Sequence, residues 1–267
     1  DGVTSSIQTQ LDSKISAGLV SVTENSNTGY RLASANASNH GDIGDGGLDL
    51  SYQPSASTTT GSTGDYSTAM GYETTASGGS STAMGSNTTA SGGSSTAMGY
   101  DTKASSLGTT AMGFGSTASA DISTAMGNYT TASGLNSTAM GAVTTASGAN
   151  STAMGAVTAA SGNTSTAMGY ETTASGDLST AMGYDTEANK SYSTSMGNGT
   201  KASGVASTAM GSNTIASGQA SIAMGISSIA SGDNSTAIGY ITTATGIYST
   251  AMGGGSLASA PASTAMG

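Results

Sequence analysis

A short box, Ser-Thr-Ala-Met-Gly or a close variant of it, returns at a fixed interval from Ser67 to the last residue, Gly267. Every box ends in a glycine, and consecutive box glycines are 14 residues apart without one insertion. The box glycines are Gly71, Gly85, Gly99, Gly113, Gly127, Gly141, Gly155, Gly169, Gly183, Gly197, Gly211, Gly225, Gly239, Gly253 and Gly267. A strict period this short predicts a solenoid, in which each repeat forms one coil and stacks on the next.

The composition excludes an ordinary globular domain. The chain has 267 residues, no tryptophan, one phenylalanine and 41 glycines, and only 7% of its residues are charged. Such a chain cannot fill one large three-dimensional core. A disordered chain would lack a strict register of apolar residues, whereas this chain keeps one. The repetition is therefore expected to be the structure.

The charge and the absence of cysteine restrict the setting and the partners. Without cysteine the chain has no disulfide framework and no thiolate metal ligand, so its stability must come from packing or assembly. The net charge of -10 disfavours nucleic acid and anionic membrane surfaces as partners. No apolar run approaches the roughly 18 residues needed to span a bilayer, so we expect no membrane insertion. These features suit an extracellular fibre.

The repeat has the consensus S-T-A-M-G-x-x-T-x-A-S-G-x-x, numbered here as positions 1 to 14. Fourteen residues are too few for a helical hairpin but enough for two short strands joined by two tight turns. In the second strand, positions 8 to 11, charge occurs at position 9, as at Lys103 and Glu187, and never at positions 8 and 10. Because strand side chains alternate between faces, we expect positions 8 and 10, such as Thr74 and Ala76, to line the inside of the coil.

The first strand, positions 1 to 5, carries no charge on either face, so both faces should be buried. The turn at positions 6 and 7 is so short that the two sheets must lie close together, and a thin coil needs small side chains inside. We therefore expect Ser67, Ala69 and Gly71 to point inward, and Thr68 and Met70 to point outward. The alternative places the methionines inside a wider, monomeric coil.

All 14 methionines of the chain occupy position 4, where isoleucine is the single substitute. An exposed apolar stripe of this length would make a monomer aggregate, so we expect it to be buried between chains. The predicted interface residues are Met70, Met84, Met98, Met112, Met126, Met140, Met154, Met168, Met182, Met196, Met210, Met224, Ile238, Met252 and Met266.

Two segments precede the repeats. Val3, Ile7, Leu11, Ile15 and Leu19 lie four apart, which predicts an apolar stripe on a short helix over residues 1–18 that gains stability by bundling with its own copies. The alternative is a fraying terminal helix. Residues 19–66 have no clean period and predict a connector with short strands, one of them around Leu48 to Tyr52. Residues 67–267 form the third predicted segment, the repeat roll.

No arrangement of catalytic groups can be assembled from this chain. It has one histidine and no cysteine, and its acids fall at variable turn positions, so we expect no enzyme activity and no cofactor. The glycine-rich turns have no P-loop lysine, and the repeats lack the fixed aspartate of calcium-binding rolls. His40 lies near Asp42 and Asp45, but no second histidine or cysteine supports a metal site, and none is expected.

Two binding surfaces are candidates. Aromatic residues gather at turn positions, where their rings could stack on a sugar or a protein surface, or simply cover the ends of the coil. The candidate ligand contacts are Tyr72, Tyr100, Tyr170, Tyr184 and Tyr240. The second surface is a Thr-Ala-Ser stripe at positions 9 to 11 that could bind ice, although charged and aliphatic residues interrupt it, including Lys201 and Leu257.

The boxes "NSTAMG" at 136–141 and 150–155 and "NSTAIG" at 234–239 resemble the repeat of the YadA-like head of trimeric autotransporter adhesins. This resemblance covers residues 67–267 and implies a left-handed parallel β-roll whose three chains associate along a common axis. Methionine and threonine stand where the family usually carries branched aliphatic residues. The all-β roll is therefore expected to be homotrimeric.

The leading segment "DGVTSSIQTQLDSK" is similar to stretches of bacteriophage tail-fibre and other structural proteins. The stretch "GDIGDGGLDLSY", followed by "TGDYSTAMG", resembles the lead into head-type repeats of long viral fibres. Together the resemblances predict a trimeric fibre on a virion or a bacterial cell surface, with a phage tail fibre favoured over a bacterial adhesin. Its partners would be its own copies and a host surface glycan or protein receptor.

Overall fold

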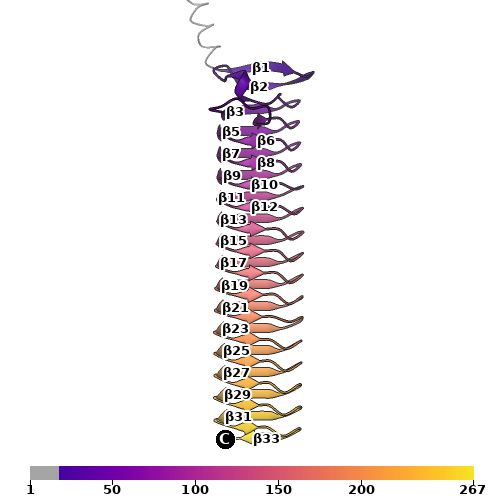
Figure 1. The fold of residues 1–267 in the computed structure, drawn as a ribbon, viewed down its shortest axis with the longest axis vertical. Helices are drawn as coiled ribbons and strands as arrows, with labels where there is room; N and C mark the ends of the chain where they lie inside the picture. The colour runs from indigo at the N-terminus through magenta and orange to yellow at the C-terminus, as the bar shows by residue number, and fades with distance from the viewer. Residues whose placement is uncertain (1–17) are drawn as a thin grey trace, which may run out of the picture. The chain divides into compact units, whose positions relative to one another are not determined.

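The computed structural model describes residues 18–267, so the helix predicted for residues 1–18 lies outside the described residues except for Gly18. Leu19 was expected to end the apolar stripe of that helix, and this is wrong, because it is the first residue of a strand that pairs with residues 27–32. The chain divides into two compact units, which meet between Tyr129 and Thr130. Unit 1 is therefore described from residue 18 to 129, and unit 2 from residue 130 to 267. Each unit is a stack of parallel β coils, as the repeat predicts (Figure 1).

The long strands of unit 1 form its first sheet. These strands are β1 (Leu19–Glu24), β2 (Asn27–Leu32), β3 (Leu48–Tyr52), β5 (Thr68–Tyr72), β7 (Thr82–Ser86), β9 (Thr96–Tyr100), β11 (Thr110–Phe114) and β13 (Thr124–Asn128). β1 and β2 pair antiparallel, and every later pair is parallel. A short 3-10 helix, Ala37–Asn39, lies between β2 and β3. The expected strand at Leu48 to Tyr52 is β3, which joins the same sheet as the repeats.

The second sheet of unit 1 consists of two-residue strands. They are β4 (Gly61–Ser62), β6 (Thr75–Ala76), β8 (Thr89–Ala90), β10 (Lys103–Ala104) and β12 (Thr117–Ala118), all parallel. Each strand therefore covers only positions 9 and 10, not the predicted positions 8 to 11. Positions 8 and 11 belong to no strand, because the chain bends at position 7 just before them and turns again at positions 12 to 14.

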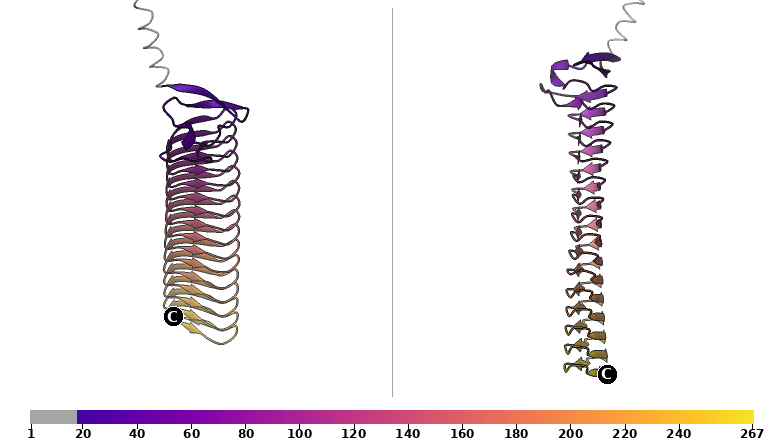
Figure 2. Two further views of the ribbon diagram at one scale, coloured as in Figure 1. Left: turned by 45° about the horizontal axis from the view of Figure 1, so that its top comes forward. Right: turned by 90° about the vertical axis from the view of Figure 1, so that its right-hand side faces the viewer.

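Unit 2 repeats the same pattern. Its first sheet contains β15 (Thr138–Ala142), β17 (Thr152–Ala156), β19 (Thr166–Tyr170), β21 (Thr180–Tyr184), β23 (Thr194–Asn198), β25 (Thr208–Ser212), β27 (Ile222–Ile226), β29 (Thr236–Tyr240), β31 (Thr250–Gly254) and β33 (Thr264–Met266). Its second sheet contains β14 (Thr131–Ala132), β16 (Thr145–Ala146), β18 (Ala159–Ala160), β20 (Thr173–Ala174), β22 (Glu187–Ala188), β24 (Lys201–Ala202), β26 (Ile215–Ala216), β28 (Ile229–Ala230), β30 (Thr243–Ala244) and β32 (Leu257–Ala258). Within each unit the two kinds of strand form separate layers, seen edge-on in Figure 2.

The pairing register places every residue of the repeat beside its own copy in the next coil. Met140 pairs with Met154, and Ala146 pairs with Ala160. A parallel pair sets neighbouring strands about 4.8 Å apart, so each position of the repeat becomes a column of like side chains. The offset between paired residues of neighbouring strands is therefore 14 residues, the same as the repeat length.

The core of each coil is thin and made of small residues. Ala69 and Ala76 have no exposed surface, and Ser67 and Thr74 are buried beside them. This confirms the predicted inward positions 1, 3, 8 and 10 and contradicts the alternative in which methionine fills a wider coil. The core also holds buried hydroxyls, such as Thr74 Oγ1, that have no hydrogen-bond partner among the described residues.

The box glycine was expected to point into the coil, and that expectation is wrong. Gly71 is only partly buried, and its φ of 123° lies in a region that side chains rarely adopt. A Cβ there would lie 2.0 Å from the carbonyl oxygen of Gly85 in the next coil. Glycine occupies the position because of the backbone conformation and the close approach of the next coil, not because the interior is small.

The corners of the coils are hydrogen-bonded to one another as well. Residues at positions 7 and 14 adopt the left-handed conformation, as at Glu73 and Ser80 with φ of 51° and 56°. The N–H of Asn87 donates to the carbonyl of Tyr72 at 2.8 Å, and the N–H of Ser94 donates to Gly79 at the same distance. The ladder thus continues through both corners, which holds the corner side chains in columns too.

Candidate functional site

The outer face of the first sheet is apolar and uncharged in both units. Positions 2 and 4 face outward there, so that threonine and methionine columns cover the sheet, as predicted. Met70 is 39% exposed and most of the other methionines are half-buried among their neighbours. The predicted orientation of Met70 through Met266 is therefore what the structure shows, while their contact with other chains stays a prediction.

This apolar face extends beyond the repeats in unit 1. Leu50 in β3 pairs with Met70 in β5, and Leu48 pairs with Thr68, so leucine occupies the methionine column one coil earlier. The sequence analysis missed Leu50 because β3 and β5 are offset by 20 residues rather than 14. The alternation in "LDLSY" was the available signal, since it places both leucines on one face of a strand.

Four charged or titratable side chains are packed together at the first coils of unit 1, a cluster that we call the cap network: Glu24, Arg31, His40 and Asp49. Arg31 Nη1 lies 2.8 Å from Glu24 Oε1, and its Nη2 donates to the carbonyl of Gly41 at 3.0 Å. His40 Nδ1 lies 2.7 Å from Asp49 Oδ2. The register of β2 against β3 sets Arg31 directly beside Asp49. Arg31, His40 and Asp49 are all buried.

The cap network keeps its carboxylates ionised. Burial raises the pKa of Asp49, but hydrogen bonds from His40 and Ser51 outweigh it and hold the pKa below its ordinary value of 3.8. Burial likewise raises the pKa of Glu24, but the Arg31 guanidinium and the N–H of Ile43 hold it below 4.5. The two carboxylates of the network therefore each have a cationic or hydrogen-bonding partner, whereas Arg31 Nε is buried without a hydrogen bond among the described residues.

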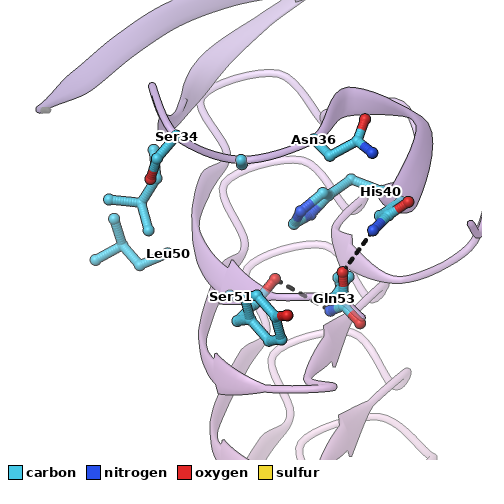
Figure 3. A pocket seen from close by; sticks show the side chains of 10 residues that line it. Ser34, Asn36, His40, Leu50, Ser51 and Gln53 are labelled. Carbon is cyan, nitrogen blue, oxygen red and sulfur yellow. Dashed lines mark hydrogen bonds between the residues drawn. The ribbon is translucent and has the colours of Figure 1, made fainter. Parts of the chain in front are cut away.

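A pocket of about 250 Å³ lies beside this network (Figure 3). Its floor is fixed by Gln53, whose carbonyl accepts from Asn39 Nδ2 at 2.7 Å and whose Nε2 donates to Ser51 Oγ at 3.1 Å. Ser34, Asn36 and His40 add polar groups on the same rim, and leucines of β2 and β3 add an apolar wall. The pocket can hold a small polar molecule.

The histidine does not meet the acids that lie near it in the sequence. His40 pairs with Asp49, whereas the carboxylate of Asp42 accepts from Asn25 and that of Asp45 accepts from the N–H of Thr28. Within residues 18–267, no group of three or more histidine, aspartate or glutamate side chains is placed to hold a metal ion.

The candidate tyrosines lie at the ends of the long strands, at position 6, and not in the turns as expected. Their rings stack in columns: Tyr170 and Tyr184 are parallel within 8°, with ring centroids 5.4 Å apart, and Tyr100 stacks on Phe114 at 5.0 Å. Tyr72 stacks on Tyr52 at 5.8 Å. Stacking covers one face of each of these rings, so the broad faces are only partly available to a ligand.

Tyr240 differs from the other four candidates. Its column neighbours are Ile226 and Gly254, and it stacks on no ring among the described residues. It is more exposed than Tyr72, Tyr100, Tyr170 or Tyr184.

Acidic turn residues have a structural role that the sequence analysis overlooked. Asp233 Oδ1 accepts from the N–H of Gln219 at 2.9 Å, and Asp177 Oδ1 accepts from the N–H of Asn163 at 2.8 Å. All four residues occupy position 13 of successive repeats. Aspartate and asparagine recur there because their short side chains satisfy a backbone donor of the preceding coil.

The outer face of the second sheet is polar and interrupted by charge. Lys201 Nζ lies 2.7 Å from Glu187 Oε1 in the neighbouring coil, and both side chains remain partly exposed. The hydrogen bond between them lowers the pKa of Glu187 and raises that of Lys201. This face is not the uniform Thr/Ser surface that ice binding requires.

Parallel β-solenoids of 14-residue coils, with small residues inside each unit and an apolar outer face on the first sheet of each, define a class of repetitive fibre proteins. A model of the YadA head domain repeat matches most of the chain, and the chain belongs to that family. The matched residues are 62–88, 76–102, 90–116, 104–130, 132–158, 160–186, 188–214, 216–240 and 244–267. No curated protein matches the chain. Among the residues that the structure describes, no helix is long and apolar enough to cross a membrane.

Proposed function

We propose that this chain is a segment of a homotrimeric surface fibre that attaches its bearer to a host. The observation that carries the proposal is the outer face of the first sheet, which runs through the long strands of both units without a charged residue. Contiguous apolar patches of this kind mark protein interfaces. The number three comes from the resemblance to YadA-like heads, whose chains associate around a common axis.

The bearer is a virion or a bacterial cell, and the phage tail fibre is the proposal we favour. The similarity of residues 1–14 to tail-fibre proteins supports it. The head of a bacterial trimeric autotransporter adhesin is the alternative, because the same repeats serve there. Both place the segment on an exposed surface, where its partner is a host glycan or protein receptor.

The role is structural and adhesive rather than enzymatic. The described residues contain one histidine, which is buried and held by Asp49, so it is not poised to activate a nucleophile. Ice binding is not proposed either, because Lys103, Glu187 and Lys201 interrupt the flat face that would be needed.

The molar mass in solution tests the proposal most directly. Light scattering at micromolar concentration should give three times the chain mass of 25.4 kDa. A monodisperse particle of one chain mass would show that the apolar face is not an interface between copies.

Two single substitutions in one coil sharpen this test. Met154→Glu should dissociate the trimer locally, because three carboxylates would be buried near one axis without a partner. Thr145→Glu introduces the same charge on the exposed face of the second sheet and should leave the mass and the melting temperature almost unchanged. Equal effects of the two substitutions would contradict the assignment of the faces.

A further inference from the structure

From β3 to β11 of unit 1 the residues at position 6 form a column of mostly aromatic side chains, one from each long strand, and one member of the column is not aromatic. We call each member of the column a rung. The position-6 residues of β3, β5, β7, β9 and β11 are paired in register as Tyr52, Tyr72, Ser86, Tyr100 and Phe114. Tyr52 and Tyr72 form one stacked pair, and Tyr100 and Phe114 form another. Ser86 separates the two pairs, so that Tyr72 and Tyr100 each have one ring face directed along the column toward the serine.

The spacing of the column sets the width of this gap. Successive rungs are one strand spacing apart, so Tyr72 and Tyr100 are separated by about 9.6 Å along the column. A ligand ring lying midway, above Ser86, would be about 5 Å from each tyrosine. The stacked pairs in the same column have centroid separations of 5.8 and 5.0 Å. A ligand ring bound over Ser86 would therefore stack on Tyr72 with one face and on Tyr100 with the other, at about the separation of the two stacked pairs.

Residues with hydrogen-bonding side chains follow Tyr72, Ser86 and Tyr100 directly in the chain. The residues that follow the three rungs at position 7 are Glu73, Asn87 and Asp101, and Asn87 Nδ2 donates to Asp101 Oδ1 at 3.1 Å. Carboxylates and amides offer acceptors and donors to the hydroxyls of a ring-shaped ligand. The two carboxylates also repel an anionic ligand.

A separate polar pocket lies on the side of the second sheet, where Thr75 and Thr89 line it and none of Tyr72, Ser86 and Tyr100 does. It has a volume of about 310 Å³ and is lined by Glu73 and Asn87 together with the loop that follows β3, including Gln53 and Ser57. This loop exists because β3 and β5 are 20 residues apart, whereas later neighbours are 14 apart. The extra residues form one wall of this pocket.

We propose that the gap over Ser86 is a subsite for one uncharged hexopyranose of a glycan. A pyranose has two apolar faces and a rim of hydroxyls, which matches two tyrosine faces and a polar edge. The site rests on the proposed attachment function and specifies the ligand class for it.

The position-6 column of unit 2 has no equivalent gap. Among its described residues, the stacked pair Tyr170 and Tyr184 is bounded by Ala156 on one side and Asn198 on the other, and no second ring lies two rungs away. This provides a matched control. Ser86→Tyr fills the gap with a ring, whereas Ala156→Tyr extends a stack without closing any gap.

The experiment compares wild type, Ser86→Tyr and Ala156→Tyr on an array of neutral, N-acetylated and sialylated glycans. Wild type should bind neutral or N-acetylated glycans in preference to sialylated ones. Ser86→Tyr should weaken this binding at least about tenfold, which corresponds to about 1.4 kcal/mol, and Ala156→Tyr should leave it unchanged. Both variants should melt at or above the wild-type temperature, because each adds a stacked ring to an exposed column.

Five outcomes would overturn the site. One is Ser86→Tyr binding glycans as well as wild type does, and a second is a preference of wild type for sialylated glycans. The third is binding of a phenylalanine-bearing peptide that Ser86→Tyr abolishes, with no binding of sugars. A wild-type trimer that attaches to cells but binds no glycan would remove the sugar site and leave the attachment function standing, whereas a monomer that binds neither would remove both.

Discussion

The cap network and the repeating coils treat buried polar groups in opposite ways. In the cap network Arg31 and Asp49 are buried as charges, and each has partners that exist once in the chain. The coils have no interior charge, and hydroxyls such as Thr144 Oγ1 are buried without a partner among the described residues. An interior charge that recurred every 14 residues would meet its own copy about 4.8 Å away, so like charges would repel along the column. Only a segment that occurs once can bury an ion pair.

The largest expected effect comes from breaking the cap network. Arg31→Met leaves the buried Asp49 and the half-buried Glu24 without their guanidinium and should cost about 3–5 kcal/mol of local stability. Lys201→Met removes the cation of the exposed pair with Glu187 and should cost about 0–1 kcal/mol. Hydrogen exchange of peptides from residues 19–53 and from the coil of Lys201 measures both. An equal loss of hydrogen-exchange protection around the two substituted residues would contradict the expected difference between a buried and an exposed ion pair.

Acid should loosen the cap network before it affects the coils. The pKa values of Glu24 and Asp49 are depressed below 4.5 and 3.8, so the stability they contribute is complete above those values and is lost as the pH falls through their folded-state pKa values. The loss should be smaller than in Arg31→Met, because the hydrogen bonds from Ser51 remain. Exchange of residues 19–53 should therefore rise below about pH 4, while coils without charged interior groups stay protected.

A smaller gain is expected from removing an interior hydroxyl. Thr144→Val keeps the shape of the side chain but removes a buried group without a partner, and should stabilise its coil by about 1–3 kcal/mol. Thr145→Val, at the exposed first residue of β16 directly after Thr144, should change stability by less than about 0.5 kcal/mol. Thermal melts of the two variants make the comparison. A loss of stability in Thr144→Val would mean that the interior hydroxyls are hydrogen-bonded in solution.

The smallest effect concerns the corners. Val143 adopts a φ of 56° at position 7, a conformation that costs a β-branched residue about 1–2 kcal/mol, whereas asparagine tolerates it. Val143→Asn should raise the melting temperature, and Asn213→Val, at the same position with φ of 53°, should lower it by a similar amount. Changes of the same sign in the two variants would show that corner strain does not control stability.

The repeat could be predicted well from the sequence because residues that share a column in the structure share a position in the 14-residue repeat. Charge at position 9 and its absence at positions 8 and 10 were enough to place Thr74 and Ala76 inside, and the short turn at positions 6 and 7, which requires a thin coil, placed Met70 outside. The box glycine was misplaced because a lack of space and an unusual backbone conformation both select glycine, so the sequence cannot tell the two reasons apart. The φ of Gly71 shows that the backbone conformation is one reason here.

The cap network could not be predicted, because it depends on pairings that occur once. Arg31 meets Asp49 through the register of β2 against β3, and His40 reaches the same carboxylate from the loop between them. The same limitation hid the gap over Ser86. It becomes visible only when Tyr72 and Tyr100 are known to stand two rungs apart in one column.

The close approach of Gly71 to Gly85 has a consequence for how a gene of this kind can change. A duplication or deletion of one whole repeat places a box glycine next to a box glycine again, so every column is preserved. An insertion of one residue would turn methionine into the coil and push a Cβ onto a carbonyl. Recombination between near-identical repeats should therefore produce viable alleles that differ by whole repeats, and surveys of natural alleles should find few that differ by other lengths.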